Sequence, residues 1–119
     1  MINFKRTDHI HICVPVDRLE EARQFYTEVI GLQEKYRPVE LNDEGIWFQL
    51  QDIELHIGVE ELKFDTIRHT AFEVSDLASA RKQLEANQVK IIPQRKLPGR
   101  DRFAFIDPFG NRMELLEYV

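Results

Sequence analysis

The chain has 119 residues, of which 43% are hydrophobic and 31% charged, and its formal net charge is −5. This length suits one compact domain, and the apolar share is enough for a packed core, which argues against disorder. The acidic balance argues against nucleic-acid binding, which relies on a dominant basic face. Cys13 is the one cysteine, which excludes an internal disulfide and a four-cysteine zinc site. We expect a cytoplasmic protein, since no apolar run approaches the roughly 18 residues of a membrane span and the N-terminus does not resemble a secretory leader.

The first half of the chain predicts a strand, a helix and three further strands. Alternating apolar residues from Asp8 to Val16 are typical of a half-buried strand. Asp17, with Glu20 three positions later, has the pattern that begins a helix. Apolar residues spaced by three and four then continue to Ile30, and Gly31 ends the helix. The three further strands are predicted at residues 32–37, 45–50 and 53–59.

The second half repeats this plan after a predicted linker at residues 60–66. Ser75 and Asp76 are candidate caps for a helix that ends at Asn87. Strands are predicted at residues 68–74, 89–93, 102–106 and 112–118, and a turn at 107–110 joins the last two. We therefore predict an α+β fold, with a single domain over residues 1–119 made of two βαβββ modules at 1–62 and 66–119.

Two imidazole–carboxylate pairs recur at matched places in the two modules. His9 and His69 each begin a strand that leads into a helix, and Glu54 and Glu114 follow them by the same number of positions. Alternation along the strands places all four on the face away from the helices. Imidazole and carboxylate together suit a divalent Zn, Ni, Fe, Mn or Co ion. Two carboxylates cancel the charge of the ion and two neutral imidazoles add none, so such a site would be neutral.

Other residues are candidates for contact with a substrate or with the ligands. They are His11, His56, Trp47, Arg100 and Arg102. His56 lies on the same strand face as Glu54 and could replace it as a ligand. The two arginines belong to a basic stretch that either clamps a substrate carboxylate or phosphate or forms an ordinary solvated loop. The histidines, for their part, could equally be polar strand residues at a cleft rim.

Five segments together resemble the vicinal oxygen chelate superfamily, which includes glyoxalases, bleomycin-resistance proteins and extradiol dioxygenases. They are DHIHICVPV, EARQFYTEVIGL, IELHIGV, RHTAFEVSDL and DPFGNRMELLE. The resemblance implies that the two modules curve into an open barrel around a metal-binding cleft. It also implies His9, His69 and Glu114 as ligands, and the glyoxalase I pattern adds Glu54.

By this resemblance the chain is similar to a metal-dependent, glyoxalase-like lyase or isomerase acting on a small molecule with vicinal oxygens. The metal would stabilise an enediolate as a Lewis acid, and Glu114 or Glu54 would act as the general base. The alternatives are a metal-free binding protein of the bleomycin-resistance type and an extradiol-type dioxygenase using iron. The resemblance also implies a homodimer with a small-molecule partner, and neither a nucleic acid nor a membrane. The cleft could be built within one chain or shared between two.

Overall fold

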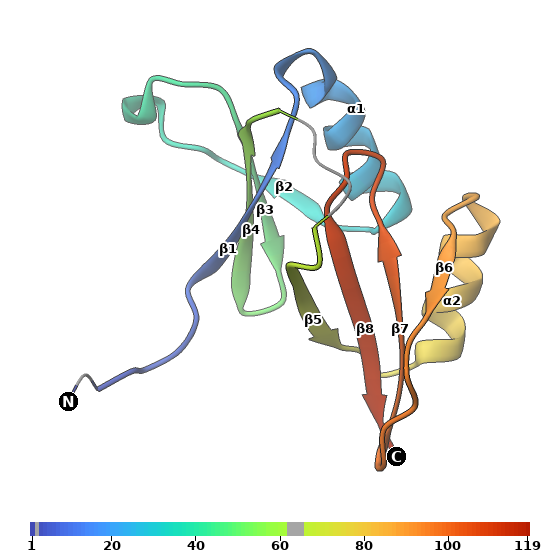
Figure 1. Cartoon of the computed structure of the whole chain (residues 1–119). Helices are drawn as coiled ribbons and strands as arrows, with labels where there is room; N and C mark the ends of the chain where they lie inside the picture. The colour runs from blue at the N-terminus through green and yellow to red at the C-terminus, as the bar shows by residue number, and fades with distance from the viewer. Residues whose placement is uncertain (2, 62–65) are drawn as a thin grey trace. The chain divides into compact units, whose positions relative to one another are not determined.

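The computed structural model describes residues 1, 3–61 and 66–119, and the chain divides into two compact units, Met1–Glu61 and Leu62–Val119 (Figure 1). Each unit contains one four-stranded sheet, and a helix follows its first strand. The predicted α+β fold with two βαβββ modules is confirmed. The cleft that the two modules were expected to enclose stays a prediction, and residues 62–65 of the predicted linker lie outside the described residues. Within the described ranges, no helix is long and apolar enough to cross a bilayer.

The first unit forms a sheet of order β1-β4-β3-β2 in which β1 runs parallel to β4. Its elements are β1 (His9–Val14), η1 (Val16–Arg18), α1 (Leu19–Gln24), η2 (Phe25–Val29), β2 (Gln33–Lys35), η3 (Val39–Leu41), β3 (Ile46–Leu50) and β4 (Ile53–Val59). The predicted helix start at Asp17 is wrong. Pro15 accepts a hydrogen bond from the Arg18 backbone amide, so Asp17 lies inside a 3-10 turn and α1 begins only at Leu19.

The helix of the first unit widens into a π-helical segment before it ends. In η2 the amide of Ile30 reaches the carbonyl of Phe25, five residues back. Gly31, with φ of +91°, then allows the chain to turn, as the sequence predicts. Tyr26 is buried and its ring centroid lies 6.1 Å from that of Phe48, so this helix covers the Phe48 face of the sheet. The opposite face of the same strands carries the polar residues.

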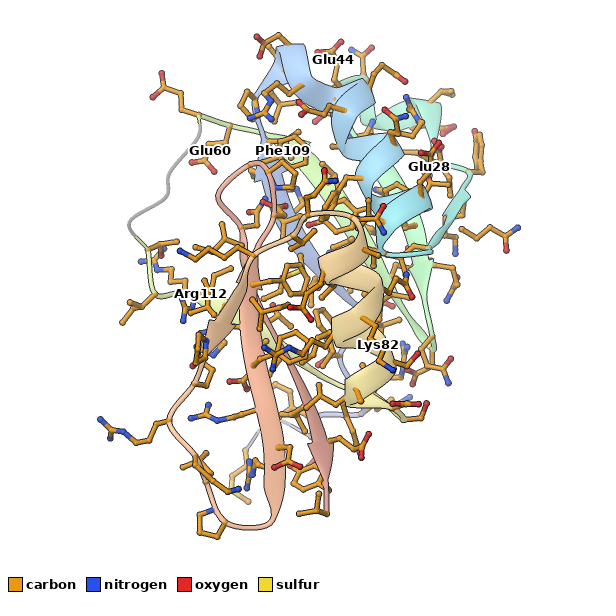
Figure 2. All side chains as sticks on the ribbon, turned by 90° about the vertical axis from the view of Figure 1, so that its right-hand side faces the viewer. Glu28, Glu44, Glu60, Lys82, Phe109 and Arg112 are labelled. Atoms are coloured by element: carbon orange, nitrogen blue, oxygen red, sulfur yellow. The ribbon has the colours of Figure 1, made fainter. Side chains whose placement is uncertain are left out.

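The second unit repeats the topology with the order β5-β8-β7-β6 and with β5 parallel to β8. Its elements are β5 (His69–Glu73), α2 (Leu77–Ala86), β6 (Ile91–Pro93), β7 (Arg100–Ile106) and β8 (Arg112–Tyr118). Asp76 caps α2 as predicted, because its carboxylate accepts the amide of Ser79. The carboxylate of Glu117 on β8 accepts the amide of Leu77, which ties the start of the helix to the sheet. Figure 2 shows α2, with Lys82 labelled, lying across the strands of this unit.

The turn between β7 and β8 is held by a buried carboxylate. Asp107 is 2% exposed and accepts hydrogen bonds from the backbone amides of Phe109 and Asn111, at 2.9 and 2.7 Å, and from the Asn111 side chain at 2.9 Å. Gly110 adopts a φ of +93°, which L-residues avoid. This turn sets the register of β8 against β7, and therefore fixes where Glu114 lies in the second sheet.

Candidate functional site

The strand register of the first unit places its predicted site residues on one face. His9 lies opposite Glu54 and His11 lies opposite His56 across the parallel pair β1–β4. Trp47 of β3 lies opposite His56 on the other side. Residues directly opposite each other in a sheet project to the same face. Five residues of this face, His9, Lys35, Trp47, Glu54 and His56, are called the first half-site below.

His56 is the centre of a stack of three rings in the first half-site. Its ring lies 4.0 Å from that of Trp47 at an interplanar angle of 0°, and 4.0 Å from that of His9 at 19°. Its Nε2 donates to Glu54 Oε1 at 2.8 Å. The His56 side chain is only 11% exposed, so the stack fixes its ring, and the ring in turn orients the Glu54 carboxylate.

Lys35 of β2 is a member of the half-site that sequence reasoning missed. Its ammonium contacts Glu54 Oε2 and donates to Gln49 Oε1 at 3.1 Å. The pKa of Glu54 is lowered, first by the hydrogen bond from His56 and then by Lys35. The Glu54 carboxylate is 24% exposed and ionised, and a protein cation already stands against one of its oxygens.

His9 and His69, which begin β1 and β5, each have an oxygen acceptor within hydrogen-bond distance of the ring nitrogen Nδ1. His9 Nδ1 lies 2.9 Å from the carboxylate of Asp8, and His69 Nδ1 lies 2.9 Å from the carbonyl of Ile67. An oxygen acceptor requires the proton to be on Nδ1, so in the neutral ring Nε2 keeps its lone pair. Metal-ligating histidines characteristically have this arrangement, with an acceptor behind the ring.

The second unit positions Glu114 in a similar but more enclosed setting. Glu114 lies opposite Ala71 across the parallel pair β5–β8, whereas His69 lies opposite Arg112. The Glu114 carboxylate is 8% exposed and accepts a hydrogen bond from Arg102 Nη1 at 2.7 Å. Four residues of this face, His69, Arg102, Arg112 and Glu114, are called the second half-site below.

Arg102 is held from two sides. Besides the bond to Glu114, its Nε and Nη2 donate to the backbone carbonyl of Arg95 at 3.2 and 2.8 Å. The guanidinium therefore has a fixed place beside the carboxylate. The sequence predicts Arg102 as a substrate-contacting residue, but its pairing with a predicted metal ligand becomes visible only in the structure.

The remaining predicted residues, His11 and Arg100, lie on the same strand faces. The His11 ring packs over Gly58, where an added Cβ would come within 2.5 Å of His11 Nε2. Its Nδ1 lies 3.8 Å from the sulfur of Cys13. The guanidinium of Arg100 lies 5.1 Å from the ring centroid of Tyr118, which holds it against the sheet.

Each unit thus brings one predicted histidine and one predicted carboxylate to the same face of its sheet. Over residues 1, 3–61 and 66–119, no group of three or more His, Cys, Asp or Glu side chains forms a preformed metal site. The first half-site offers an imidazole and a carboxylate in adjacent register, and the second offers the same two groups two positions apart.

The comparisons with known proteins agree with this architecture. Residues 8–115 match the profile of the Glyoxalase/Bleomycin resistance protein/Dioxygenase superfamily. A crystal structure from Bacillus anthracis, of a protein assigned to the glyoxalase family, is 37% identical with a TM-score of 0.90, and all of both chains is covered. FosX, a fosfomycin resistance protein from Listeria monocytogenes, is 18% identical with a TM-score of 0.81, covering 98% of this chain and 94% of that one.

A third structure, an integron cassette protein of V. cholerae, is 19% identical with a TM-score of 0.74, covering 100% of this chain and 99% of that one. At such identities the likeness to FosX and to the cassette protein shows the fold alone. The family profile and the Bacillus anthracis protein show family membership as well as the fold. The profile spans most of the chain, and the Bacillus anthracis protein is more similar in sequence. The chain belongs to the Glyoxalase/Bleomycin resistance protein/Dioxygenase superfamily.

Proposed function

We propose that this protein is a metal-dependent, glyoxalase-like lyase or isomerase that acts on a small molecule with vicinal oxygens. The proposed ligands of a divalent Zn, Ni, Fe, Mn or Co ion are His9, Glu54, His69 and Glu114. The observation that carries the proposal is that an oxygen acceptor faces Nδ1 of both histidines. In a neutral ring this arrangement leaves the lone pair of Nε2 to bind a metal ion. One crystal structure of FosX is of a complex with Mn(II), which makes manganese a suitable first probe.

The donor set fits such an ion. Neutral imidazoles and ionised carboxylates are ligands that first-row divalent ions accept, and the lowered pKa of Glu54 keeps its carboxylate ionised at neutral pH. When bound, the ion would supply Lewis acidity toward two neighbouring substrate oxygens and so stabilise an enediolate. We propose one half-site from each unit, taken from the same chain or from two chains of a homodimer.

The protein's own residues supply the proton transfer in this proposal. Glu114 is the better placed base, because its low exposure excludes water and Arg102 fixes one of its oxygens. Glu54 would return the proton, and His56 would keep that carboxylate oriented through the hydrogen bond at 2.8 Å. Trp47 and His11 would line the pocket. We further propose a cytoplasmic location, which the acidic composition and the family membership support.

A second candidate is a metal-free small-molecule binding protein of the bleomycin-resistance type. One observation favours it: Lys35 and Arg102 already neutralise Glu54 and Glu114, as protein cations would in a site that never takes a metal. A sequestering pocket, however, has no need of the acceptors behind His9 and His69. Metal binding separates the two candidates.

The test is metal binding by the full chain. Protein stripped with a chelator is dialysed against Mn(II), Ni(II), Zn(II) or Fe(II), and bound metal is measured by elemental analysis. Trp47, the single tryptophan, reports the same event by fluorescence because it stacks on His56. We expect one ion per pair of half-sites. A chain that takes up none of these ions would exclude the enzymatic proposal and favour the metal-free binder.

Two variants and a control assign the ligands. His69→Ala and Glu114→Ala should each weaken Mn(II) binding by at least about tenfold. Mutation of a residue that only hydrogen-bonds to a metal ligand already lowers metal affinity by about this factor. Glu28→Ala, which changes an exposed glutamate in the π-helical segment η2, should leave Mn(II) affinity unchanged. Circular dichroism checks that all three variants fold. Full affinity in a folded His69→Ala or Glu114→Ala chain would show that the ligand assignment is wrong.

A further inference from the structure

Both oxygens of the Glu54 carboxylate already accept a hydrogen bond from the protein. His56 Nε2 donates to Oε1 at 2.8 Å, and the Lys35 ammonium contacts Oε2. The two donors belong to different strands, β4 and β2, so the carboxylate is held from two sides. A divalent ion that takes Glu54 as a ligand must therefore compete with one of these two donors.

His56 is the donor that stays in place. Its ring is stacked on Trp47 and on His9, with a centroid distance of 4.0 Å in each case, and its side chain is 11% exposed. Turning this ring away from Glu54 would break both stacks and leave a nearly buried ring nitrogen without its partner. The donor that can leave the carboxylate is therefore Lys35, whose side chain is 35% exposed on a flexible stem.

Lys35 has a second acceptor within reach. Its ammonium also donates to Gln49 Oε1 at 3.1 Å. The Gln49 amide is oriented by its own Nε2, which donates to the backbone carbonyls of Gln51 and Ile53 at 2.7 and 3.0 Å. These two bonds fix which end of the amide faces Lys35. Gln49 therefore presents its oxygen to the ammonium whether or not Lys35 touches Glu54.

We infer that Lys35 is a built-in counter-ion that holds Glu54 until a divalent ion binds there and then moves onto Gln49 alone. The inference rests on the proposed function, because it requires Glu54 to be a metal ligand. An ammonium and a divalent ion on the same partly buried carboxylate repel each other strongly. Leaving Glu54 relieves this repulsion, and the bond to Gln49 keeps the ammonium partnered. The Lys35–Glu54 contact thereby raises the metal concentration at which the first half-site is loaded.

A double-mutant cycle between Lys35 and Gln49 tests this transfer. Zn(II) binding to the full chain is measured by equilibrium dialysis. Gln49→Met removes the second acceptor, so we expect Zn(II) affinity to fall by about fivefold, as for loss of one hydrogen bond to a partly exposed charged group. In the Lys35→Met background the same substitution should change the affinity by less than about twofold, because no ammonium has to move.

Gln33→Met is the matched control for Gln49→Met. Gln33 is exposed and lies opposite Gln49 across the β2–β3 pair, so its replacement should leave Zn(II) affinity unchanged in both backgrounds. A role of Gln49 that is confined to the β3–β4 turn would weaken binding equally with and without Lys35. That result would overturn the inference.

NMR follows the ammonium directly in the unaltered chain, with the Lys35 signal assigned by its loss in Lys35→Met. Zn(II) suits this measurement because it is diamagnetic. Before Zn(II) is added, we expect hydrogen-bond couplings from Lys35 Nζ to the side-chain carbonyl carbons of both Glu54 and Gln49. At saturating Zn(II) the coupling to Glu54 should disappear, and that to Gln49 should remain. If Gln49→Met does not fold, this measurement decides.

The outcomes separate this inference from the proposed function. A chain that binds Zn(II) and still shows the coupling between Lys35 and Glu54 at saturation lacks the transfer, so the inference is wrong while the proposed function stands. A chain that takes up none of the divalent ions overturns the proposed function, and the inference fails with it.

Discussion

His56 and Glu114 hold the same register position in the two units. His56 lies opposite His11, and Glu114 lies opposite Ala71, which in each case is two positions after the histidine that begins the strand. Glu54, by contrast, lies opposite His9, a place that Arg112 takes in the second unit. The equal chain separation of the two imidazole–carboxylate pairs therefore does not correspond to equal places in the two sheets.

This offset bears on which residue of β4 would bind the proposed metal ion. We expect Glu54→Gln to weaken Mn(II) binding more than His56→Ala does, because only the carboxylate offsets the charge of the ion. His56→Ala should still lower Mn(II) affinity by about tenfold, because a residue that orients a metal ligand is lost. Both are measured by metal-dependent quenching of Trp47, with equilibrium dialysis as a check because His56 stacks on that ring. The reverse order of the two effects would assign the ligand to His56.

Removal of Lys35 should strengthen metal binding. In Lys35→Met the ammonium no longer stands against Glu54 Oε2, so a divalent ion meets neither repulsion nor a competitor at that oxygen. We expect Mn(II) affinity to rise by about fivefold or more in equilibrium dialysis, a change of about 1 kcal/mol. The effect should shrink at high salt, because screening weakens the repulsion. Unchanged or weaker affinity would mean that Lys35 and the ion do not share this carboxylate.

Cys13 should be an unreactive thiol. Burial, followed by the hydrogen bond and charge of Glu60, raises its pKa to about 11 from the model-compound value of 9.0. The neutral thiol is favoured in the folded chain, so at pH 8 the thiolate is about a hundredfold scarcer than in the unfolded chain. Alkylation by iodoacetamide should be slower to a similar degree, and its rate should still rise between pH 9 and 10, where that of the denatured control levels off. Equal rates in folded and denatured protein would contradict the shift.

Much of the fold could be predicted from local pattern. The limits of β4 and β8 agree with the predicted residues 53–59 and 112–118, because strict alternation and flanking turns mark both ends. The helix of the first unit was harder to predict. Pro15 and the π-helical segment at Phe25–Val29 leave an α-helix of only Leu19–Gln24, since backbone bonds to Pro15 and Phe25 replace the regular pattern.

The site could be predicted in its residue types and not in its pairings. The sequence suggests histidines and carboxylates as ligands, because the two pairs recur at the same separation along the chain. Lys35 meets Glu54 across 19 positions of sequence only after β2, β3 and β4 have paired in one register. That register depends on loop geometry, for which local alternation gives no signal. The ion pair of Lys35 with Glu54 therefore had to come from the structure.

The Asp107 turn should be a major source of stability for the second unit. In Asp107→Ala the amides of Phe109 and Asn111 lose their acceptor, and the first of them is buried. A buried donor without a partner costs the free energy of its lost solvation, so we expect the free energy of unfolding to fall by about 3 kcal/mol. Asp52→Ala, which changes an exposed aspartate in the β3–β4 turn, should change it by no more than about 0.5 kcal/mol. Urea denaturation monitored by circular dichroism compares the two variants, and similar midpoints would show that the carboxylate of Asp107 does not hold the turn.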